Sequence, residues 1–244
     1  MALMVGANAE VTRADLTGVS WTLTTEASVL TSEGDEVFDD QVDSGSTLPY
    51  DSSHTATATW GDAASTAISD YFFTGSTETA AFLFEFDHDS GQTEGNGGAG
   101  SGSVFFTPDQ NITSYAFSGE YGLTGTGLLH LEVSLRAVGG GEGVTLFESY
   151  QETETATNQT FTLGEEEGEH NNLIGDLSGA LVPGTEYVLN YDFHTVVGDA
   201  GTSNAAGNLS LTLGGGATVV PAPSAALLGV VGLGLVGWFR RRSV

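Results

Sequence analysis

Apolar side chains recur at every second residue over most of this chain, and no other feature of the sequence constrains its fold as strongly. Residues 80–87 show the pattern plainly, because Phe82, Phe84 and Phe86 alternate with other residues, two of them acidic. A period of two places alternate side chains on opposite faces of an extended strand. No long stretch has the 3.6-residue period of an amphipathic helix. The chain is therefore predicted to consist mainly of β-strands.

About eleven strands are expected, separated by turns rich in Gly, Ser and Asp. The clearest are residues 80–87, 129–137, 187–195 and 208–213, and shorter ones are residues 19–24, 55–60, 69–73, 103–107, 114–117, 144–150 and 160–163. Each long strand has one apolar and one polar face, as in a sheet with one buried side. Two such sheets bury their apolar sides against each other. The prediction is an all-β fold, a jelly-roll-like antiparallel β-sandwich formed by residues 10–213.

A second arrangement divides the body into two smaller sandwiches near Gly91–Gly102. This segment is rich in glycine, with serine, threonine and asparagine among the other residues. Such a composition is typical of a flexible loop, so residues 91–102 are predicted to lie outside the strands.

Charge is distributed unevenly along the chain. There are 32 acidic residues and five basic ones, all arginine, for a formal net charge of −27. The acidic residues lie between Glu10 and Asp199, whereas three arginines lie within the last five residues. Because phosphate recognition needs a basic surface, no binding to nucleic acid is expected. The absence of cysteine excludes disulfides, thiolate metal sites and a cysteine nucleophile.

The C-terminal residues 219–244, VVPAPSAALLGVVGLGLVGWFRRRSV, differ in kind from the acidic body. Fifteen uncharged residues run from Ala225 to Phe239. As a helix they would extend about 22 Å, a minimal span for a hydrocarbon core of roughly 30 Å. Ser224 is a suitable N-cap, and Arg240–Arg242 would remain on the cytoplasmic side. The tail therefore predicts one C-terminal transmembrane helix, with the acidic body outside the cytoplasm.

The order of features in this tail resembles that of a PEP-CTERM sorting signal. The features are Val220, Pro221, Ala222 and Pro223, then the helix rich in Gly, Leu and Val, then Arg240, Arg241 and Arg242. The tail departs from the family pattern at Ala222, where a glutamate is usual. The resemblance implies recognition by the secretion machinery and an exosortase, cleavage near the prolines, and delivery to the cell surface or an extracellular polysaccharide matrix. It covers 26 of the 244 residues and implies nothing about the body.

The N-terminus is interpreted as the remnant of a signal peptide. Ala7-Asn8-Ala9 has the small-x-small form of a signal peptidase site, so the mature chain would begin near Glu10. A short disordered segment is the alternative. The expected order along the chain is the remnant (1–9), the sandwich (10–213), a linker (214–220) and the sorting tail (221–244).

Asp87, Asp89 and Glu94 are the candidate ligands of a calcium ion. An Asp-x-Asp-x-Gly sequence at the exit of a strand can place side-chain and carbonyl oxygens around a hard cation. The match departs from the EF-hand loop, because Gly91 takes the fifth position. The alternative is a solvated acidic loop, which a chain with 32 acids forms easily.

Two strands carry further potential ligands on their polar faces. His130 and Glu132 lie on one strand, and Asp192 and His194 lie on another. If the two strands are neighbours, the four side chains would converge on Zn²⁺ or another transition metal. If they are not, the four residues are ordinary exposed polar groups.

No residue is assigned a catalytic role. A glycosidase needs two carboxylates about 5–9.5 Å apart, and Glu148, Glu152 and Glu154 lie on or near one strand. Nothing in the sequence distinguishes these three from the other acids. The chain contains no Gly-x-Ser-x-Gly or His-Glu-x-x-His motif, and without lysine it has no phosphate-binding Gly-Lys-Ser/Thr loop.

The expected function is that of a non-enzymatic, exported bacterial surface or extracellular-matrix protein. It would be anchored in the inner membrane by its tail and then released by exosortase processing. Its acidic shell would keep it soluble in salt and would bridge extracellular polysaccharide through divalent cations. The alternative is a carbohydrate-binding module or carbohydrate-active enzyme on the same sandwich. Sugars stack on exposed aromatic side chains, for which the candidates are Trp21, Trp60, Tyr71 and Tyr150.

Overall fold

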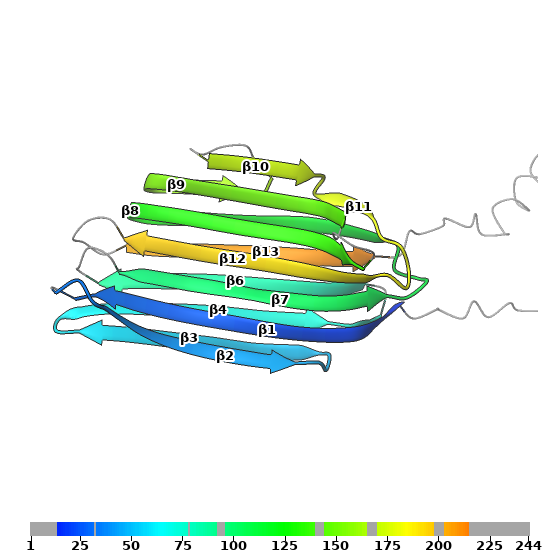
Figure 1. Cartoon of the computed structure of the whole chain (residues 1–244), viewed down its shortest axis with the longest axis horizontal. Helices are drawn as coiled ribbons and strands as arrows, with labels where there is room; N and C mark the ends of the chain where they lie inside the picture. Colours follow the sequence, from blue (N-terminus) through cyan, green and yellow to red (C-terminus); the bar gives the residue numbers. More distant parts are fainter. Residues whose placement is uncertain are drawn as a thin grey trace, which may run out of the picture.

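The structure is a computed structural model, and it describes residues 14–31, 33–77, 79–91, 96–139, 144–164, 170–197 and 203–214. These residues form thirteen strands and no helix, so none of them belongs to a helix long and apolar enough to cross a membrane (Figure 1). The predicted signal-peptide remnant and the sorting tail, including Val220–Pro223 and Arg240–Arg242, lie outside the described residues.

The strands follow one another along the whole described body. They are β1 (Ala14–Leu30), β2 (Glu36–Gly45), β3 (Tyr50–Trp60), β4 (Ala63–Thr74), β5 (Ser76–Thr77), β6 (Thr79–Gly91), β7 (Gly97–Pro108), β8 (Ser114–Val138), β9 (Val144–Thr162), β10 (His170–Gly175), β11 (Ser178–Ala180), β12 (Glu186–Val197) and β13 (Ser203–Gly214).

The strands lie in two layers, as predicted, and the fold is an antiparallel two-sheet β-sandwich. Sheet I has the order β2-β1-β7-β12-β8, and sheet II has the order β3-β4-β6-β13-β8. Figure 1 shows β1, β7 and β12 in front of β4, β6 and β13. Neighbouring strands pair antiparallel throughout the two sheets.

Strand β8 belongs to both sheets. Its first half, residues 114–124, pairs with β13, and its second half, residues 127–138, pairs with β12. Strand β9 follows β8 through both layers, with register shifts around residues 123–129 where the ribbon passes from one sheet to the other. The sequence predicted two separate strands in the place of each of β8 and β9. They are single long strands because the polar stretch between the apolar runs, glycine-rich in β8 but free of glycine in β9, is a bend within the strand.

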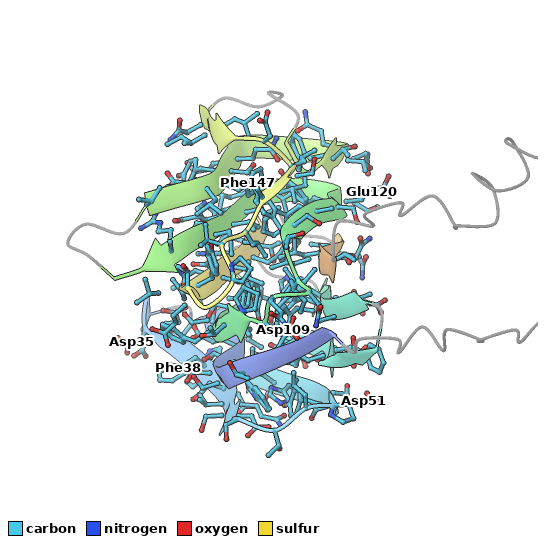
Figure 2. All side chains as sticks on the ribbon, turned by 90° about the vertical axis from the view of Figure 1, so that its right-hand side faces the viewer. Asp35, Phe38, Asp51, Asp109, Glu120 and Phe147 are labelled. Atoms are coloured by element: carbon cyan, nitrogen blue, oxygen red, sulfur yellow. The ribbon has the colours of Figure 1, made fainter. Side chains whose placement is uncertain are left out.

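The predicted inward faces are confirmed. Phe82, Phe84 and Phe86 are buried, and they meet aromatic rings of the opposite sheet. The ring centroids of Phe84 and Tyr191 are 4.3 Å apart, and those of Phe86 and Phe193 are 4.4 Å apart. Figure 2 shows the side chains filling the space between the layers. These aromatic pairs, together with the buried leucines of β8, β12 and β13, form the core.

The glycine-rich segment is not a loop over most of its length, which corrects the prediction for residues 91–102. Strand β7 begins at Gly97 and lies inside sheet I between β1 and β12. A Cβ atom on Gly98 would lie 2.5 Å from Cδ2 of His88, and one on Gly100 would lie 2.8 Å from Cδ2 of Phe86. Glycine is required because side chains of sheet II occupy the space that a side chain on β7 would need. Strands before and after this segment share both sheets, so the body does not divide there.

Strand β2 is absent from the predicted strands, and its polar side chains close the seam between the two sheets. Its residues face β3, whose outer edge has no strand partner among the described residues. The Asp39 Oδ2 atom accepts a hydrogen bond from the Thr57 backbone N–H at 2.8 Å, and Gln41 Oε1 accepts one from Thr55 N–H at 3.0 Å. Three successive inward positions of β2, Asp39, Gln41 and Asp43, are therefore polar, so the strand does not show the apolar alternation expected of it.

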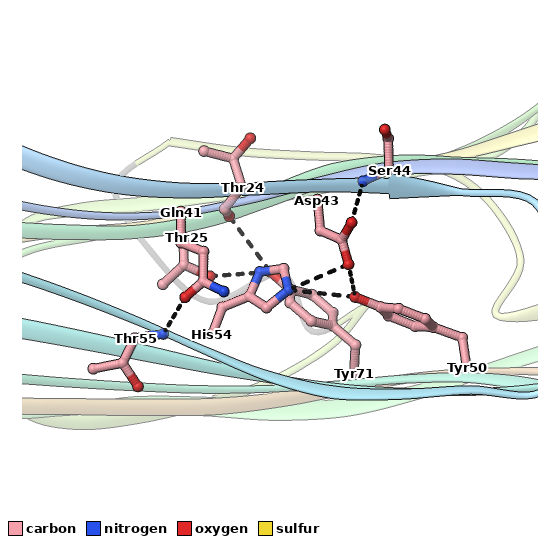
Figure 3. A network of polar contacts seen from close by, with 9 residues as sticks. All are labelled: Thr24, Thr25, Gln41, Asp43, Ser44, Tyr50, His54, Thr55 and Tyr71. Atoms are coloured by element: carbon pink, nitrogen blue, oxygen red, sulfur yellow. Dashed lines mark hydrogen bonds and ion pairs between the residues drawn. The ribbon is translucent and has the colours of Figure 1, made fainter.

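The seam continues as a polar network around Asp43, drawn in Figure 3. The Tyr50 hydroxyl donates to Asp43 Oδ2 at 2.7 Å and lies 3.3 Å from Nε2 of His54. The hydrogen bond from Tyr50 lowers the pKa of Asp43, and burial, followed by that carboxylate, raises the pKa of Tyr50 to about 12. Burial also lowers the pKa of His54. The network holds β2 against β3 where no backbone ladder joins them.

A second buried histidine links the two sheets near the other end of β6. His88 is 1% exposed, and its ring lies between two hydroxyl groups, Ser65 Oγ at 2.9 Å and Thr195 Oγ1 at 2.6 Å. Because Ser65 donates its proton to the Gly97 carbonyl at 2.8 Å, it accepts from Nε2–H, and Thr195 donates to Nδ1. The neutral ring is thus fully paired, and burial lowers the pKa of His88 to about 4.

Candidate functional site

The outer face of sheet II is hollowed by a groove with a volume of about 620 Å³. This lies within the range of small-molecule sites, roughly 300–1,000 Å³. Its lining comes from β4, β6, β13, β8 and β9, and consists of Ile68, Asp70, Glu85, Phe86, Asp87, Glu120, Tyr121, Gly122, Leu123, Thr124, Asn158, Gln159, Thr160, Asn204, Ala206, Gly207 and Asn208. In Figure 2, Glu120 and Asp51 of sheet II lie on the opposite side of the molecule from Asp35 and Phe38.

Strand register places four polar side chains in one row across this groove. Asp70 of β4 lies opposite Glu85 of β6, which lies opposite Asn208 of β13, which lies opposite Glu120 of β8. Residues directly opposite on one face have Cβ atoms about 4.5–5.5 Å apart, so the four side chains are within reach of one bound molecule. The row exists because each strand presents its polar face outward while its apolar face forms the core.

The floor of the groove lies in the adjacent row. There Asp87 is opposite Ala206, and Ala206 is opposite Gly122. Ala206 has a short side chain and Gly122 has none, whereas the neighbouring row has longer side chains. The surface is therefore hollow at these two residues. The Asn204 amide donates to Asp87 Oδ1 at 2.7 Å, which holds one carboxylate at the rim.

The far wall of the groove is made by the bend of the β8–β9 ribbon. Gly125 has φ 105° and Asn158 has φ 50°, both in the left-handed region. The Asn158 Oδ1 atom accepts a hydrogen bond from Gly125 N–H at 3.2 Å. Asparagine tolerates this conformation better than most residues, and its amide fixes the two bends to each other.

The groove is more acidic than the chain as a whole, and it lacks a countercharge. Four of its seventeen lining residues are carboxylates, against 32 in 244 overall, and no lysine, arginine or histidine is among the residues that line it. Like charges directly opposite on a sheet are destabilising, and Asp70 and Glu85 are such a pair. On sheet I, by contrast, Arg136 Nη2 lies 2.7 Å from Glu148 Oε2.

A second hollow of about 340 Å³ continues the groove toward β3. It shares Asp70 and Glu85 with the groove and adds Asp51 and Phe72. Phe72 is 45% exposed on the outer face of β4. The two hollows together form an elongated site with a carboxylate pair in the middle and an aromatic ring at one end.

The predicted calcium ligands are only partly described. Asp87 and Asp89 lie on strand β6, which continues to Gly91, so this stretch is extended and does not form a loop around one point. Glu94 lies outside the described residues. Within the described part of the chain, no group of three or more His, Asp or Glu side chains is arranged to hold a metal ion. The calcium site stays a prediction.

The strands that carry the two histidine–carboxylate pairs are neighbours. His130 lies opposite His194, and Glu132 lies opposite Asp192, on the outer face of sheet I. The ring centroids of the two histidines are 6.2 Å apart. His130 Nδ1 lies 3.5 Å from Glu152 Oε2, so its nearest described partner is a residue of β9. The register therefore brings the four residues together, but they belong to the described part in which no metal-holding group is found.

The carboxylates and aromatic residues that the sequence offered as candidates for a sugar site do not line the groove. Glu148 is paired with Arg136, and Glu152 accepts a hydrogen bond from the Tyr150 hydroxyl at 3.0 Å. Trp21 and Tyr71, two of the four candidate sugar-stacking residues, are buried in the core. Trp60 is 49% exposed and Tyr150 is partly exposed, but neither lines the groove. The aromatic ring beside the groove is Phe72, which the sequence did not single out.

No known protein family matches the sequence, and no curated protein matches it. Among solved structures the chain is similar to one of infectious bursal disease virus, Gx strain, at 12% identity, with 84% of this chain and 71% of that chain covered and a TM-score of 0.26. A structure of the Gt strain has 15% identity, covers 84% of this chain and 57% of that chain, and has a TM-score of 0.25. The chain thus spans less than two thirds of the second structure. At these TM-scores the likeness carries no argument about function.

Proposed function

We propose that this chain is an exported, non-enzymatic surface or matrix protein that holds polysaccharide in the groove of sheet II. The observation that carries the proposal is the groove itself. It is a hollow of about 620 Å³ lined by carboxylate, amide and hydroxyl groups, extended by a second hollow with an exposed phenylalanine. Polar groups that converge beside an apolar surface match the two kinds of surface of a sugar ring.

Export is supported by the sequence of the tail. The PEP-CTERM-like order of Val220–Pro223, an apolar helix and Arg240–Arg242 would direct the chain to the inner membrane and to an exosortase. Residues 225–239 would form the membrane-spanning helix, and the body would lie outside the cytoplasm. After processing, the protein would remain at the cell surface or in the extracellular matrix.

The proposal includes a jelly-roll-like arrangement of the sandwich. Strands β12 and β13, the last of the body, lie between β7 and β8 in sheet I and between β6 and β8 in sheet II. Late strands that return to lie beside earlier ones, one in each sheet, are a property of Greek-key sandwiches. This arrangement places β13 in the middle of the groove.

Filling the groove tests the binding proposal. Ala206 is exposed on its floor, whereas Ala116 is exposed on the same face of sheet II but does not line the groove. Full-length Ala206→Trp protein in neutral detergent should lose binding to neutral hexasaccharides in a calorimetric titration. Ala116→Trp protein should bind like the wild type. Equal binding by all three proteins, or a wild type that binds no hexasaccharide of any charge, would contradict the proposal.

The location of the protein is tested separately. Mass spectrometry of the protein isolated from its native host should show a mature N-terminus near Glu10 and, after processing, a C-terminus near Pro221–Pro223. Before processing, the full chain should sediment with the inner membrane. An uncut chain that is freely soluble in the cytosol would contradict export and anchoring.

A carbohydrate-active enzyme is the alternative, and the same groove would serve it. The two candidates differ in product formation. Incubation of the full-length protein with the bound hexasaccharide should release no new reducing ends. A steady release that Glu85→Gln or Asp70→Asn abolishes would favour the enzyme.

A further inference from the structure

We propose that the ligand of the groove is a glycan chain with free amino groups, such as a polymer of de-N-acetylated hexosamine. This inference rests on the proposed function and adds the chemical class of the ligand. Its basis is the charge inside the groove together with the shape of the two hollows.

The unbalanced carboxylates are the first step of the argument. Asp70 and Glu85 lie directly opposite each other, and Glu120 lies one strand beyond Asn208 in the same row. No basic side chain is among the residues lining either hollow, so nothing described within the groove relieves their repulsion. A ligand amine placed in this row would form charge-assisted hydrogen bonds with the carboxylates and would remove that repulsion.

The hydrogen-bonding groups between and beside the carboxylates are the second step. Asn208 lies between Glu85 and Glu120, and Gln159 and Thr160 line the wall toward β9. Amides and hydroxyls both donate and accept, as the hydroxyl groups of a sugar require. A simple cation such as a polyamine would leave these groups without a matching partner, whereas an amino sugar offers an amine and hydroxyls on the same ring.

The length of the site is the third step. The hollow of about 340 Å³ adjoins the groove through Asp70 and Glu85 and contains the exposed ring of Phe72. An apolar ring at one end would contact the C–H face of a further sugar unit. The ligand is therefore an oligomer that crosses both hollows, and an anionic uronate chain is disfavoured by the same carboxylates.

The test compares three hexasaccharides by calorimetry with the full-length protein in neutral detergent at pH 6.0 and 150 mM NaCl. They are hexaglucosamine with free amines, its fully N-acetylated form, and hexagalacturonate. The free-amine chain should bind at least about tenfold more tightly than the acetylated chain, since each charged pair contributes modestly in water. Hexagalacturonate should not bind measurably.

The matched variants separate the groove from the general negative field of the protein. Asp70→Asn with Glu85→Gln removes two charges from the groove, and Glu33→Gln with Asp62→Asn removes two from exposed turns. The first pair should lower affinity for the free-amine chain by about tenfold, and the second should leave it within about twofold. If both double variants lose the same affinity for the free-amine chain, the net charge of the protein alone attracts the ligand, and the inference is overturned.

The remaining outcomes distinguish this inference from the proposed function. If the acetylated chain binds as tightly as the free-amine chain, and Phe72→Ser weakens both, the groove binds sugar and the preference for amines is wrong. If the wild type binds none of the three chains nor the neutral hexasaccharides, both proposals fail.

Discussion

His88 shows at the scale of one residue how a polar group is accommodated in an aromatic core. Its ring nitrogens are both paired with hydroxyls, and the hydroxyls belong to different sheets. The arrangement satisfies the neutral ring, because Ser65 accepts from Nε2–H and Thr195 donates to Nδ1. Protonation would place a positive charge in a site that is almost closed to water, which is why burial lowers the pKa of His88 to about 4.

The first prediction concerns stability below neutral pH. A histidine with a pKa near 6.5 when unfolded and about 4 when folded binds its proton more tightly in the unfolded chain. The stability that the neutral ring contributes is complete above pH 6.5 and is lost as pH falls toward 4, by at most about 3 kcal/mol. Urea unfolding at several pH values should show that the advantage of wild type over His88→Gln shrinks across this window. His194→Gln, at an exposed site, serves as the control. An advantage over His88→Gln that is constant with pH would contradict the assignment.

At the scale of one element, β7 and β2 both form strands of the sandwich without the alternation of apolar and polar residues expected of such strands. β7 is glycine-rich because sheet II side chains occupy its inward positions. β2 carries Asp39, Gln41 and Asp43 on the side that faces the other sheet, where they accept hydrogen bonds from backbone N–H groups of β3 and from the Tyr50 hydroxyl of the same strand. An edge strand with unpaired N–H groups invites pairing with another chain, so acceptors on β2 protect β3 from aggregation.

The second prediction concerns Gly98. An added methyl group would collide with the ring of His88, which cannot move because hydroxyls hold both of its nitrogens. Gly98→Ala should lower the free energy of unfolding by about 1–3 kcal/mol, measured by urea denaturation. Ala99→Ser, on the outer face of the same strand, should change it by less than about 0.5 kcal/mol. A Gly98→Ala protein as stable as wild type would show that β7 does not lie this close to β6.

The third prediction concerns the edge of β3. Asp39→Ala with Gln41→Ala removes both acceptors of the Thr55 and Thr57 N–H groups. Hydrogen exchange of peptides covering residues 50–60 should become about tenfold faster at these amides. The matched control is Asp40→Ala, because Asp40 lies on the opposite face of β2. Unchanged exchange in the double variant would mean that the side chains do not close the seam.

At the scale of the whole molecule, the acidic residues set how stability depends on the solution. All 32 acidic residues lie in the body, together with only two arginines, and Arg136–Glu148 is the one arginine–carboxylate pair among the described residues. Mutual repulsion destabilises the compact state, and salt reduces it because the Debye length falls to about 8 Å at physiological ionic strength.

The fourth prediction is a rise of the melting temperature with salt. Calorimetry of the full-length protein from 10 mM to 500 mM NaCl should show a rise of about 2–4 °C for each kcal/mol of repulsion relieved. KCl should act equally, since screening does not depend on the ion.

CaCl2 at matched ionic strength tests the predicted calcium site. A further rise with calcium that Asp87→Asn with Asp89→Asn abolishes would support that site, and the absence of any extra rise would contradict it.

The sequence did not predict the groove, although it predicted the solvent face of one strand that lines it. It placed Glu85 and Asp87 on the solvent face of their strand, opposite Phe82, Phe84 and Phe86, and the structure agrees. It did not identify Asp70, Asn208 and Glu120 as neighbours of Glu85, because these residues lie on other strands. Periodicity reports the face of a strand that is buried, and contains no information about which strands pair. The sequence left the face of Trp21 and Tyr71 open for the same reason, since an isolated aromatic residue fits either face, and the structure buries both.

The sequence by itself determined the class of fold and which face of each long strand is buried. A strand that alternates apolar and polar residues has one apolar face, and in water that face must be covered by another sheet. Few classes of fold meet this requirement. Only the tertiary structure decided the strand order, the role of glycine in β7, the polar closure by β2 and the carboxylate row of the groove. These features depend on contacts between residues distant along the chain. The free energy of such a contact depends on both side chains of the pair, so it cannot be inferred from one residue alone.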